Sequence, residues 1–268
     1  MSTERALPAA ERAADELGYA VVIPAYNESA TIADVARRAL RQGLPVVVVD
    51  DGSTDGTGAA LAGLPVRVLK NRHNVGKGSS LWRGMRYALE LGVTGVITLD
   101  GDGQHAPEDI SRLVRVAHAH PQEIIIGARL GRRQRAPRAR YLANRLADFC
   151  IGWAAGQPFD DSQSGFRVYP ASLLARIAVR HGPTRGFVFE SEMLIAAARL
   201  GIHVRSVPVE SIYPLVARPS HFRPVRDTAR IGRMVAWQLV RRGLHPAGLY
   251  RSLSRRPERD TRAVNETT

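Results

Sequence analysis

Short runs of apolar, mostly β-branched residues alternate with helical patterns along the first 130 residues of this chain. Each run has the length and composition of a buried strand. The runs cover residues 19–23, 45–49, 66–69, 96–99 and 123–127, and Pro24 is expected to end the first. Helical patterns lie between them, at residues 29–42, 53–62, 79–91 and 107–119. This alternation is typical of right-handed strand–helix–strand crossovers. It predicts an α/β fold with a mostly parallel sheet sandwiched by helices.

Polar residues follow three of these runs, at the point where each strand is expected to end. They are Tyr26 and Glu28, Asp50 and Asp51, and Asp100 and Asp102. The carboxyl ends of parallel strands meet at one edge of a sheet, and ligands bind at that edge in such folds. The three polar clusters are therefore expected to converge on a single site.

The spacing of Asp100 and Asp102 points to a metal ion. Two carboxylates separated by one glycine repel each other, and burying them without a cation is unfavourable. A side-chain amide follows at Gln104, and this set of oxygen ligands suits a hard divalent cation such as Mg²⁺ or Mn²⁺. Such an ion keeps open positions that phosphate oxygens commonly fill. The alternative is a solvated glycine-rich turn, which the convergence of three polar clusters disfavours.

The chain has a formal net charge of +13, and most of that charge lies in two segments. Residues 129–145 contain seven arginines and no acidic residue, and residues 218–256 contain ten arginines against Asp227 alone. The remainder of the chain is therefore close to neutral. A basic chain can bind nucleic acid, but no nucleic-acid-binding motif is visible in the sequence, so we expect no nucleic-acid partner.

The sequence predicts a cytoplasmic protein. The single cysteine, Cys150, excludes an internal disulfide and fits a reducing compartment. The N-terminus has no apolar segment of the kind found in signal peptides, and no stretch of about 18 uncharged apolar residues is present. We therefore expect a protein of the cytoplasm that lies peripherally on the cytoplasmic face of a membrane.

Five motifs, taken in order, resemble inverting glycosyltransferase family 2, whose members have the Rossmann-like GT-A fold. The first four are Pro24-Ala25-Tyr26-Asn27-Glu28, Val49-Asp50-Asp51-Gly52-Ser53-Thr54-Asp55, Asn74-Val75-Gly76-Lys77-Gly78 and Asp100-Gly101-Asp102-Gly103-Gln104-His105. The fifth is Asp161-Ser162-Gln163-Ser164-Gly165-Phe166-Arg167. It narrows the resemblance to the branch of dolichyl-phosphate mannosyltransferase and the polyprenyl-phosphate glycosyltransferases.

The resemblance also implies how the chain is divided. It covers residues 19–215, which are expected to form the GT-A domain. Residues 1–18 are expected to be a lead-in, and residues 216–268 a basic helical C-terminal extension with a polar tail.

A nucleoside-diphosphate sugar is implied as the donor, and most of the site is assigned to it. Contacts with the nucleotide are implied for Pro24, Ala25, Tyr26, Glu28, Asp51, Lys77, Asp100 and Arg129. Asp51 would accept a hydrogen bond from the base, and the planar guanidinium of Arg129 would contact the diphosphate. The metal ion bridging the diphosphate would be held by Asp100, Asp102 and Gln104, which makes Asp102 a catalytic residue. Guanine with mannose and uracil with glucose both fit as donor base and sugar.

The fifth motif would line the acceptor side, and the resemblance implies catalytic roles for Asp161, Arg129 and Arg167. The favoured acceptor is a polyprenyl phosphate, which is already ionised, so Asp161 would mainly position Arg167 or the acceptor. With the alternative acceptor, a hydroxyl of another lipid or of a glycan, Asp161 would have to act as a true base. The oligomeric state, including a homo-oligomer, is left open.

Two later segments each admit two interpretations. Glu190 and Glu192 begin a predicted helix at residues 187–200, where both favour the positive helix end, with a role in the site as the alternative for Glu190. Residues 226–242 form a second predicted helix, which is basic and either lies on an anionic membrane surface or packs on the core. Its apolar residues are Ile231, Met234, Val235, Trp237 and Leu239, and the pattern continues at Leu249, Tyr250 and Leu253.

Overall fold

A single sheet of eight strands organises the described part of the protein. The computed structural model describes residues 18–130, 138–179, 182, 186–210, 212 and 224–260. From one edge to the other, the strands are β3 (Arg67–Lys70), β2 (Val46–Asp50), β1 (Tyr19–Ala25), β4 (Gly95–Thr98), β6 (Arg167–Pro170), β5 (Ile124–Ala128), β7 (Val204–Pro208) and β8 (Glu258–Arg259). Every neighbouring pair is parallel except the two formed by β6, which runs antiparallel to β4 and β5. The predicted mostly parallel α/β sheet is confirmed.

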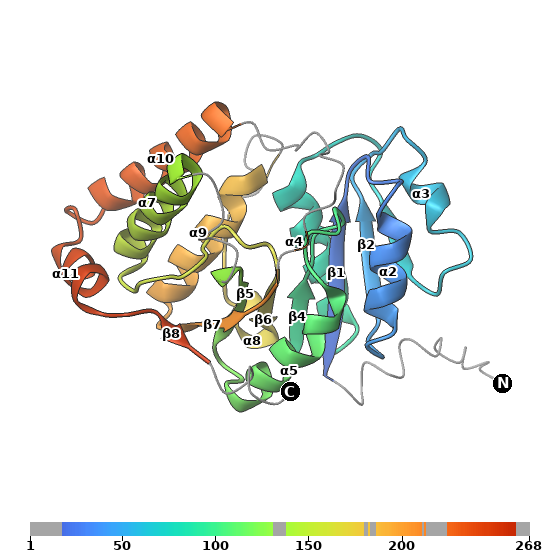
Figure 1. The fold of residues 1–268 in the computed structure, drawn as a ribbon, viewed down its shortest axis with the longest axis horizontal. Helices are drawn as coiled ribbons and strands as arrows, with labels where there is room; N and C mark the ends of the chain where they lie inside the picture. Colours follow the sequence, from blue (N-terminus) through green and yellow to red (C-terminus); the bar gives the residue numbers. More distant parts are fainter. Residues whose placement is uncertain are drawn as a thin grey trace.

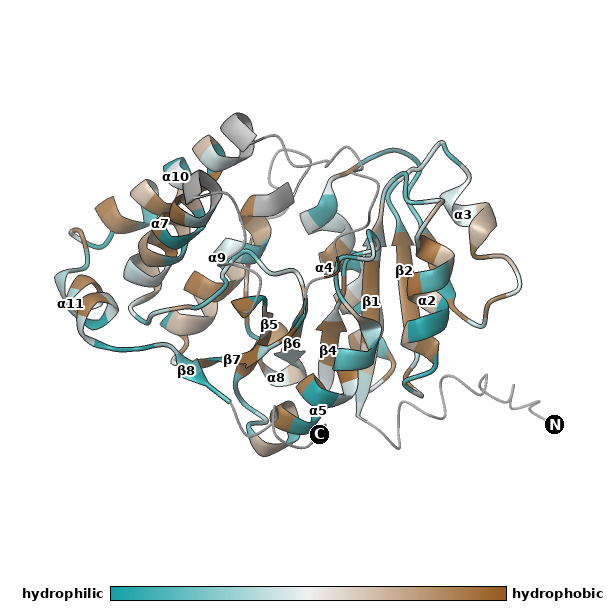
Figure 2. Cartoon of the chain, in the orientation of Figure 1, coloured by the Kyte–Doolittle hydropathy of each residue, from teal (hydrophilic) through white to brown (hydrophobic). Residues whose placement is uncertain are grey.

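Helices cover both faces of this sheet (Figure 1). In chain order they are α2 (Ile32–Leu40), α3 (Thr57–Ala60), α4 (Lys77–Glu90), the 3₁₀ helix η1 (Pro107–Asp109), α5 (Ile110–Ala119), α7 (Arg138–Ala155), α8 (Ala171–Leu174), α9 (Gly186–Arg199), α10 (Pro224–Val240) and α11 (Pro246–Ser254). Apolar residues of α2 and α5 pack on one face, and those of α4, α7, α9 and α10 pack on the other. Figure 2 shows the apolar residues concentrated on the strands and on the helix sides that face them. The predicted helices of the first 130 residues are confirmed to within about four residues at each end.

The first strand extends one residue past Pro24, where its end was predicted. On the β2 side, the carbonyl of Ala25 accepts the N–H of Asp51 at 2.8 Å. On the β4 side, the carbonyl of Val22 accepts the N–H of Leu99 at 3.1 Å. Pro24 lies two residues beyond Val22 and so faces the β4 side, where pairing has already ended. Its missing N–H therefore removes no hydrogen bond from the sheet, and the strand continues.

Three short elements, β6, α8 and β8, were not predicted. β6 is only four residues long and contains a buried arginine and a proline, so it does not stand out as an apolar run. Its antiparallel direction places Arg167 opposite Thr98, at the carboxyl end of β4. The motif at residues 161–167 therefore enters the sheet at the same edge as the residues that follow β4. The valine-rich stretch that follows α9 forms the strand β7, which ends at Pro208.

The C-terminal helices pack on the core. Ile231, Met234, Val235 and Leu239 of α10 are buried against the cluster that α7 and α9 also form. Of the two interpretations open for this helix, packing on the core is the one observed for these four residues. The chain then returns to the sheet as β8, and the Arg259 guanidinium nitrogens lie 2.7 and 2.6 Å from the carboxylate oxygens of Asp160.

No helix in the described ranges has the length and apolarity needed to cross a membrane. The predicted lead-in, except for Gly18, and residues 216–223 and 261–268 of the predicted extension lie outside the described residues. The predicted domain boundaries remain a prediction.

Candidate functional site

The polar clusters predicted from the sequence come together at one edge of the sheet. Asp51 follows β2, Asp100 and Asp102 follow β4, and Arg129 follows β5. The N-terminal end of α4 brings Lys77 to the same edge. This is the carboxyl edge of the parallel strands, where the sequence predicted a ligand site.

Lys77, Asp100 and Glu190 form an ion-paired triad at the centre of this edge. Lys77 Nζ lies 2.7 Å from Asp100 Oδ1 and 3.3 Å from Glu190 Oε1. Burial would lower the pKa of Lys77, but the two carboxylates outweigh it and raise that pKa above its ordinary value. Burial would also raise the pKa of Asp100, yet the Lys77 ammonium lowers it. Lys77 and Asp100 are therefore both charged at neutral pH.

Asp102 has the opposite electrostatic character. Its pKa is raised, first by burial and then by the negative charge of Asp100. Its Oδ1 accepts the backbone N–H of Gln104 at 2.9 Å, which fixes the turn after β4. A nearby divalent cation would relieve the repulsion between the two aspartates.

The side chains at this edge fit a metal ion that is coordinated partly by the protein and partly by a substrate. In the described ranges, no group of three or more His, Cys, Asp or Glu side chains is arranged to hold a metal. Asp100 and Asp102 supply two carboxylates, and Gln104 adds an amide oxygen. Mg²⁺ is typically held by one or two carboxylates together with substrate phosphates, and this set of side chains suits that kind of site.

Gly165 allows the fifth motif, residues 161–167, to pack directly against Asp100. A Cβ atom at Gly165 would lie 2.5 Å from Asp100 Oδ2, so any side chain here would displace the carboxylate. The Thr98 hydroxyl donates a 2.8 Å hydrogen bond to the Gly165 carbonyl and holds the loop against β4. The fifth motif is thus coupled to the aspartate pair through its backbone.

Arg129 and Asp161 form a two-point ion pair. Arg129 Nε lies 2.8 Å from Asp161 Oδ2, and one terminal nitrogen lies 3.0 Å from Oδ1. The backbone N–H of Arg129 also donates to Oδ2 at 3.0 Å. Asp161 is completely buried, whereas the Arg129 side chain is partly exposed. The two predicted catalytic residues are therefore neighbours, and Asp161 orients Arg129.

Arg167 is completely buried beneath the fifth motif. Its guanidinium donates to the carbonyls of Ser162 and Ser164 at 2.8 and 2.7 Å, and to that of Glu190 at 2.8 Å. A further bond of 3.0 Å joins it to the Tyr169 hydroxyl. The sequence predicted Arg167 as a catalytic residue oriented by Asp161. Its catalytic role remains a prediction, and what the structure shows is that Arg167 fixes the backbone of the fifth motif.

Asp51 fixes the loop that carries Lys77. Its Oδ1 accepts from Asn71 Nδ2 at 2.7 Å and from the N–H of Val75 at 2.9 Å, and its Oδ2 accepts from the N–H of Gly76 at 2.9 Å. Asp51 is buried, and these donors surround its carboxylate. The predicted contact with a donor base remains a prediction, and the loop contacts are what the structure shows.

The turn after β1 is tied to the turn after β2. The N–H of Asn27, a residue in the left-handed conformation, donates to Ser53 Oγ at 3.0 Å. The N–H of Glu28 donates to Thr57 Oγ1 at 2.8 Å. These bonds hold the turn that carries two of the other predicted donor contacts, Tyr26 and Glu28, whereas Pro24 and Ala25 are buried at the end of β1.

Asp55 completes this connection. Its Oδ2 accepts the N–H of Ser29 at 3.0 Å, and its Oδ1 accepts the N–H and hydroxyl of Thr57 at 3.0 and 2.5 Å. Slight burial acts to raise the pKa of Asp55, but the hydrogen bonds from Thr57 and Ser29 lower it well below its usual range. Asp55 thus stabilises the two turns.

His105 is buried in the segment that follows β4. Its ring packs on Phe166 with 5.4 Å between ring centroids. Burial lowers the pKa of His105 to about 4, so the ring is neutral at pH 7. Its Nδ1 is buried with no hydrogen-bond partner.

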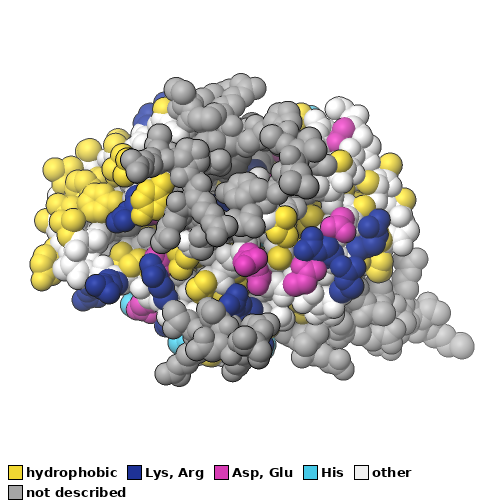
Figure 3. Space-filling view, in the orientation of Figure 1, with side chains coloured by type: hydrophobic (Ala, Val, Ile, Leu, Met, Phe, Trp, Pro, Cys, Tyr) yellow, Lys and Arg dark blue, Asp and Glu magenta, His cyan; other side chains and the backbone are white. Residues whose placement is uncertain are grey.

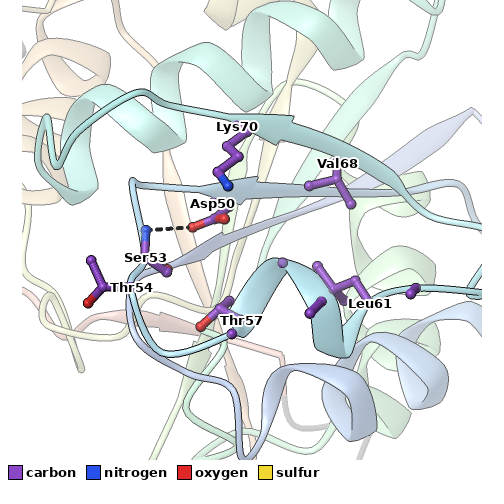
Figure 4. A pocket seen from close by; sticks show the side chains of 11 residues that line it. Asp50, Ser53, Thr54, Thr57, Leu61, Val68 and Lys70 are labelled. Carbon is purple, nitrogen blue, oxygen red and sulfur yellow. Dashed lines mark hydrogen bonds between the residues drawn. The ribbon is translucent and has the colours of Figure 1, made fainter.

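A separate cavity of about 470 Å³ lies between α3 and the β2–β3 edge (Figure 4). Asp50, Ser53, Thr57, Val68 and Lys70 are among its lining residues. Asp50 Oδ1 accepts the N–H of Ser53 at 2.9 Å, a contact within the turn after β2. This cavity is distinct from the site at the carboxyl edge of the sheet, here called the charged edge. The charged edge is formed by Lys77, Asp100, Asp102 and Arg129, and none of these four residues lines the cavity.

Two residues that act in the site were not among the principal predictions. The sequence leaves both a helix-end role and a site role open for Glu190. In the structure its side chain pairs with Lys77. The signal for it is an acidic residue directly after the apolar run Phe187–Phe189, although Glu192 gives a similar signal before the apolar run Met193–Ile195. Asn71, which orients Asp51, has no comparable signal, because asparagine is common in turns.

Known proteins resemble this chain in sequence. The profile of the family described as Glycosyl transferase family 2 matches residues 20–181. A UDP-N-acetylglucosamine–dolichyl-phosphate N-acetylglucosaminyltransferase of Methanococcus voltae is 29% identical, over 75% of this chain and 87% of that protein. An undecaprenyl-phosphate mannosyltransferase of Micrococcus luteus is 31% identical, over 70% of this chain and 81% of that protein.

The fold also resembles a solved structure. Glucosyl-3-phosphoglycerate synthase from Mycobacterium tuberculosis, crystallised with Mn²⁺ and UDP-glucose, superposes with a TM-score of 0.59 and 23% sequence identity. The superposition covers 87% of this chain and 81% of that one. The GT-A fold implied by the sequence motifs is confirmed by this similarity. The family profile, which matches more than half of the chain, and the 31% identity with the Micrococcus luteus transferase show that the chain belongs to glycosyl transferase family 2 and is an enzyme.

Proposed function

We propose that this enzyme transfers a hexosyl group, with inversion, from a nucleoside-diphosphate sugar to a polyprenyl phosphate. The observation that carries the proposal is the meeting of Asp100 and Asp102 with Lys77 and Arg129 at the carboxyl edge of the sheet. Carboxylates for a metal and cations for a diphosphate are the groups that such a donor requires. The similarity to transferases named for dolichyl-phosphate and undecaprenyl-phosphate acceptors supports the choice of acceptor.

Asp100, Asp102 and Gln104 are proposed to hold Mg²⁺ or Mn²⁺. When bound, the ion stabilises the negative charge of the departing nucleoside diphosphate. The raised pKa of Asp102 supports this assignment, because the repulsion from Asp100 falls when a cation lies between the two carboxylates.

Lys77 and Arg129 are proposed to receive the diphosphate. Both cations already lie at the edge, and carboxylates orient them. Asp100 and Glu190 pair with Lys77, and Asp161 pairs with Arg129. Arg129 remains partly exposed, so its guanidinium can bond phosphate oxygens while Asp161 keeps its plane fixed. Preorganised charge of this kind favours the transition state without further rearrangement.

The acceptor phosphate needs no strong base. One of its oxygens forms the bond to the anomeric carbon while the bond from that carbon to the diphosphate oxygen breaks, and no proton is transferred. The ion pair of Asp161 with Arg129 supports a positioning role for Asp161. An acceptor hydroxyl would require Asp161 to take a proton, and its pairing with a guanidinium disfavours that.

A screen of nucleotide sugars tests this function. Release of nucleoside diphosphate is measured with each donor, with and without polyprenyl phosphate and with Mg²⁺, Mn²⁺ or a chelator. We expect release that requires both the lipid phosphate and the divalent ion. Equal release with a lipid alcohol in place of the lipid phosphate would favour the hydroxyl acceptor.

Because a polyprenyl phosphate resides in a bilayer, we further propose that the enzyme works at an anionic membrane surface.

A further inference from the structure

The most exposed large apolar side chains of the described ranges gather on three helices. Seven of them lie on α7, α10, α11 and the turn between α10 and α11, and each is between 58% and 72% exposed. The seven are Leu142, Leu146, Trp237, Val240, Leu244, Tyr250 and Leu253, here called the docking face. Figure 3 shows apolar side chains gathered at the end of the molecule that these helices form, with Lys and Arg side chains beside them. An apolar concentration of this size on one end of a protein marks an interaction surface.

The docking face is continuous from α7 to α11. Along α7, Leu142, Leu146, Phe149 and Trp153 follow one another at helical spacing, and the last two rings lie 6.3 Å apart. The Trp153 indole N–H donates a 2.8 Å hydrogen bond to the carbonyl of Leu244. This bond joins the apolar stripe of α7 to the turn that leads into α11.

The fold itself does not require the outer side of α10. Its inner side is already buried through Ile231, Met234, Val235 and Leu239. Trp237 and Val240 lie on the other side of the same helix and remain exposed. This outer side, which also carries Arg233 and Arg241 at helical spacing from Trp237, is available to a partner.

The charge around the docking face identifies that partner. Residues 228–257 contain seven arginines and no acidic residue. The Arg241 guanidinium lies 5.7 Å from the ring centroid of Trp237, so cation and indole are presented together. The pKa of Arg199 is lowered by burial and then by Arg242 and Arg241, as expected where positive charges accumulate.

We propose that the docking face binds the headgroup region of an anionic lipid bilayer. Exposed Trp and Tyr rings beside Leu side chains suit the boundary between headgroups and acyl chains, and the arginines suit anionic lipid. A second copy of the chain is a poorer occupant, because it would bring a second arginine-rich surface against the first. An acidic protein would satisfy the charge without using the protruding aromatic and aliphatic side chains in this way.

The docking face is connected to the charged edge through α9. Helices α7 and α10 both pack on α9, and Glu190 of α9 contacts Lys77 in the site. Binding to a bilayer is independent of the reaction, but its use in catalysis rests on the proposed function. In that case, the docking face brings a membrane-embedded acceptor within reach of the site.

Flotation of the full chain with vesicles tests the proposal. Vesicles of phosphatidylcholine alone are compared with vesicles that also contain phosphatidylglycerol. We expect binding to the anionic vesicles, weakening as salt rises. The triple variant Trp237→Ser, Tyr250→Ser, Leu253→Ser should lose at least about tenfold in vesicle affinity. The pair Arg241→Gln, Arg251→Gln should lose the preference for anionic lipid. Matched controls are Val68→Ser on β3 and Arg37→Gln on α2, which lie at the other end of the sheet.

Three results would overturn the proposal. They are no binding of the full chain to anionic vesicles, equal binding by the triple variant, and a dimer in light scattering that the triple variant converts to monomer without any vesicle binding by the parent. Failure of the proposed function is read separately, with a short-chain polyprenyl phosphate that is soluble without a bilayer. The triple variant should keep its transfer rate on that acceptor and lose rate only on the vesicle-embedded one. An inactive parent with intact vesicle binding would remove the function and leave the docking face.

Discussion

The charged edge and the docking face use the same cation in opposite ways. At the edge, Arg129 and Arg167 are held by carboxylate and carbonyl oxygens, and Arg167 is completely buried. On the docking face, Arg241 and Arg251 are exposed and their neighbours in sequence include no acidic residue. A buried guanidinium with all its donors satisfied fixes a structure, whereas an exposed one supplies charge to a partner. Burial and partners, more than residue type, therefore decide what each arginine does.

The aromatic and aliphatic residues show the same contrast. At the edge, Phe166 is buried and packs against His105. On the docking face, Trp237 and Tyr250 are exposed although the core beneath α10 is filled. Changes at the edge should therefore alter catalysis and stability, while changes on the docking face should alter vesicle binding and, through it, transfer to a vesicle-embedded acceptor.

The largest effect is expected from Asp102→Asn. Removing one carboxylate from the pair should lower kcat/KM for transfer by about a thousandfold, because the proposed metal site loses a charged ligand. The free energy of unfolding should not fall, since the repulsion from Asp100 that raises the pKa of Asp102 is relieved. Steady-state kinetics at saturating donor and metal, together with urea unfolding, measure both quantities. Full activity would remove the metal from this site.

Arg167→Met should lower the stability of the protein at the charged edge and leave the docking face unchanged. The substitution leaves the buried carbonyls of Ser162, Ser164 and Glu190 without their donor, and we expect a loss of about 3 kcal/mol in the free energy of unfolding. The matched control is Arg251→Met, an exposed arginine, which should change the unfolding free energy by less than about 0.5 kcal/mol. Equal effects in the two variants would break the distinction between buried and exposed arginines.

Arg129→Lys should reduce catalysis while keeping the charge. A lysine cannot reproduce the two-point contact with Asp161 or bond a phosphate in the same plane, so we expect kcat/KM to fall by about 10- to 100-fold. Arg145→Lys on α7, an exposed arginine, serves as the control and should retain parental kinetics. Unchanged kinetics in Arg129→Lys would show that Asp161 orients no catalytic group.

The sequence predicted the sheet and the meeting of the acidic clusters because both follow from local periodicity. A strand of alternating or continuous apolar residues and a helix of period 3.6 are visible without tertiary information. Parallel connection then forces Asp51, Asp100 and Arg129 to one edge. These predictions hold for residues whose place in the fold is decided by their position within their own strand or helix.

The failures arose where tertiary partners decide. β6 is recognisable only once β4 and β5 are in place, since its four residues include a charged side chain that the fold buries. The pairing of Asp161 with Arg129 and the burial of Arg167 depend on that strand. The inner face of α10 followed from periodicity, but whether core or membrane would cover it did not. Local pattern gives the face of a helix, and only packing gives its neighbour.

Asp55→Asn should produce the smallest effect and sharpen the account of the edge. The carboxylate accepts hydrogen bonds from Ser29 and Thr57, and these lower its pKa. A pKa that is lower in the folded state than in the unfolded chain stabilises the fold above about pH 4, the ordinary value for aspartate, and this contribution is lost as pH falls through the folded value. Because Asp55 is exposed, solvent screening reduces the contribution to about 1 kcal/mol at pH 7. Urea unfolding between pH 7 and pH 2 should show that the variant is less stable at neutral pH and loses less stability on acidification. Asp34→Asn, on the surface of α2, is the control and should leave the pH profile nearly parental. A parental profile in Asp55→Asn would mean that the two turns are held together without this carboxylate.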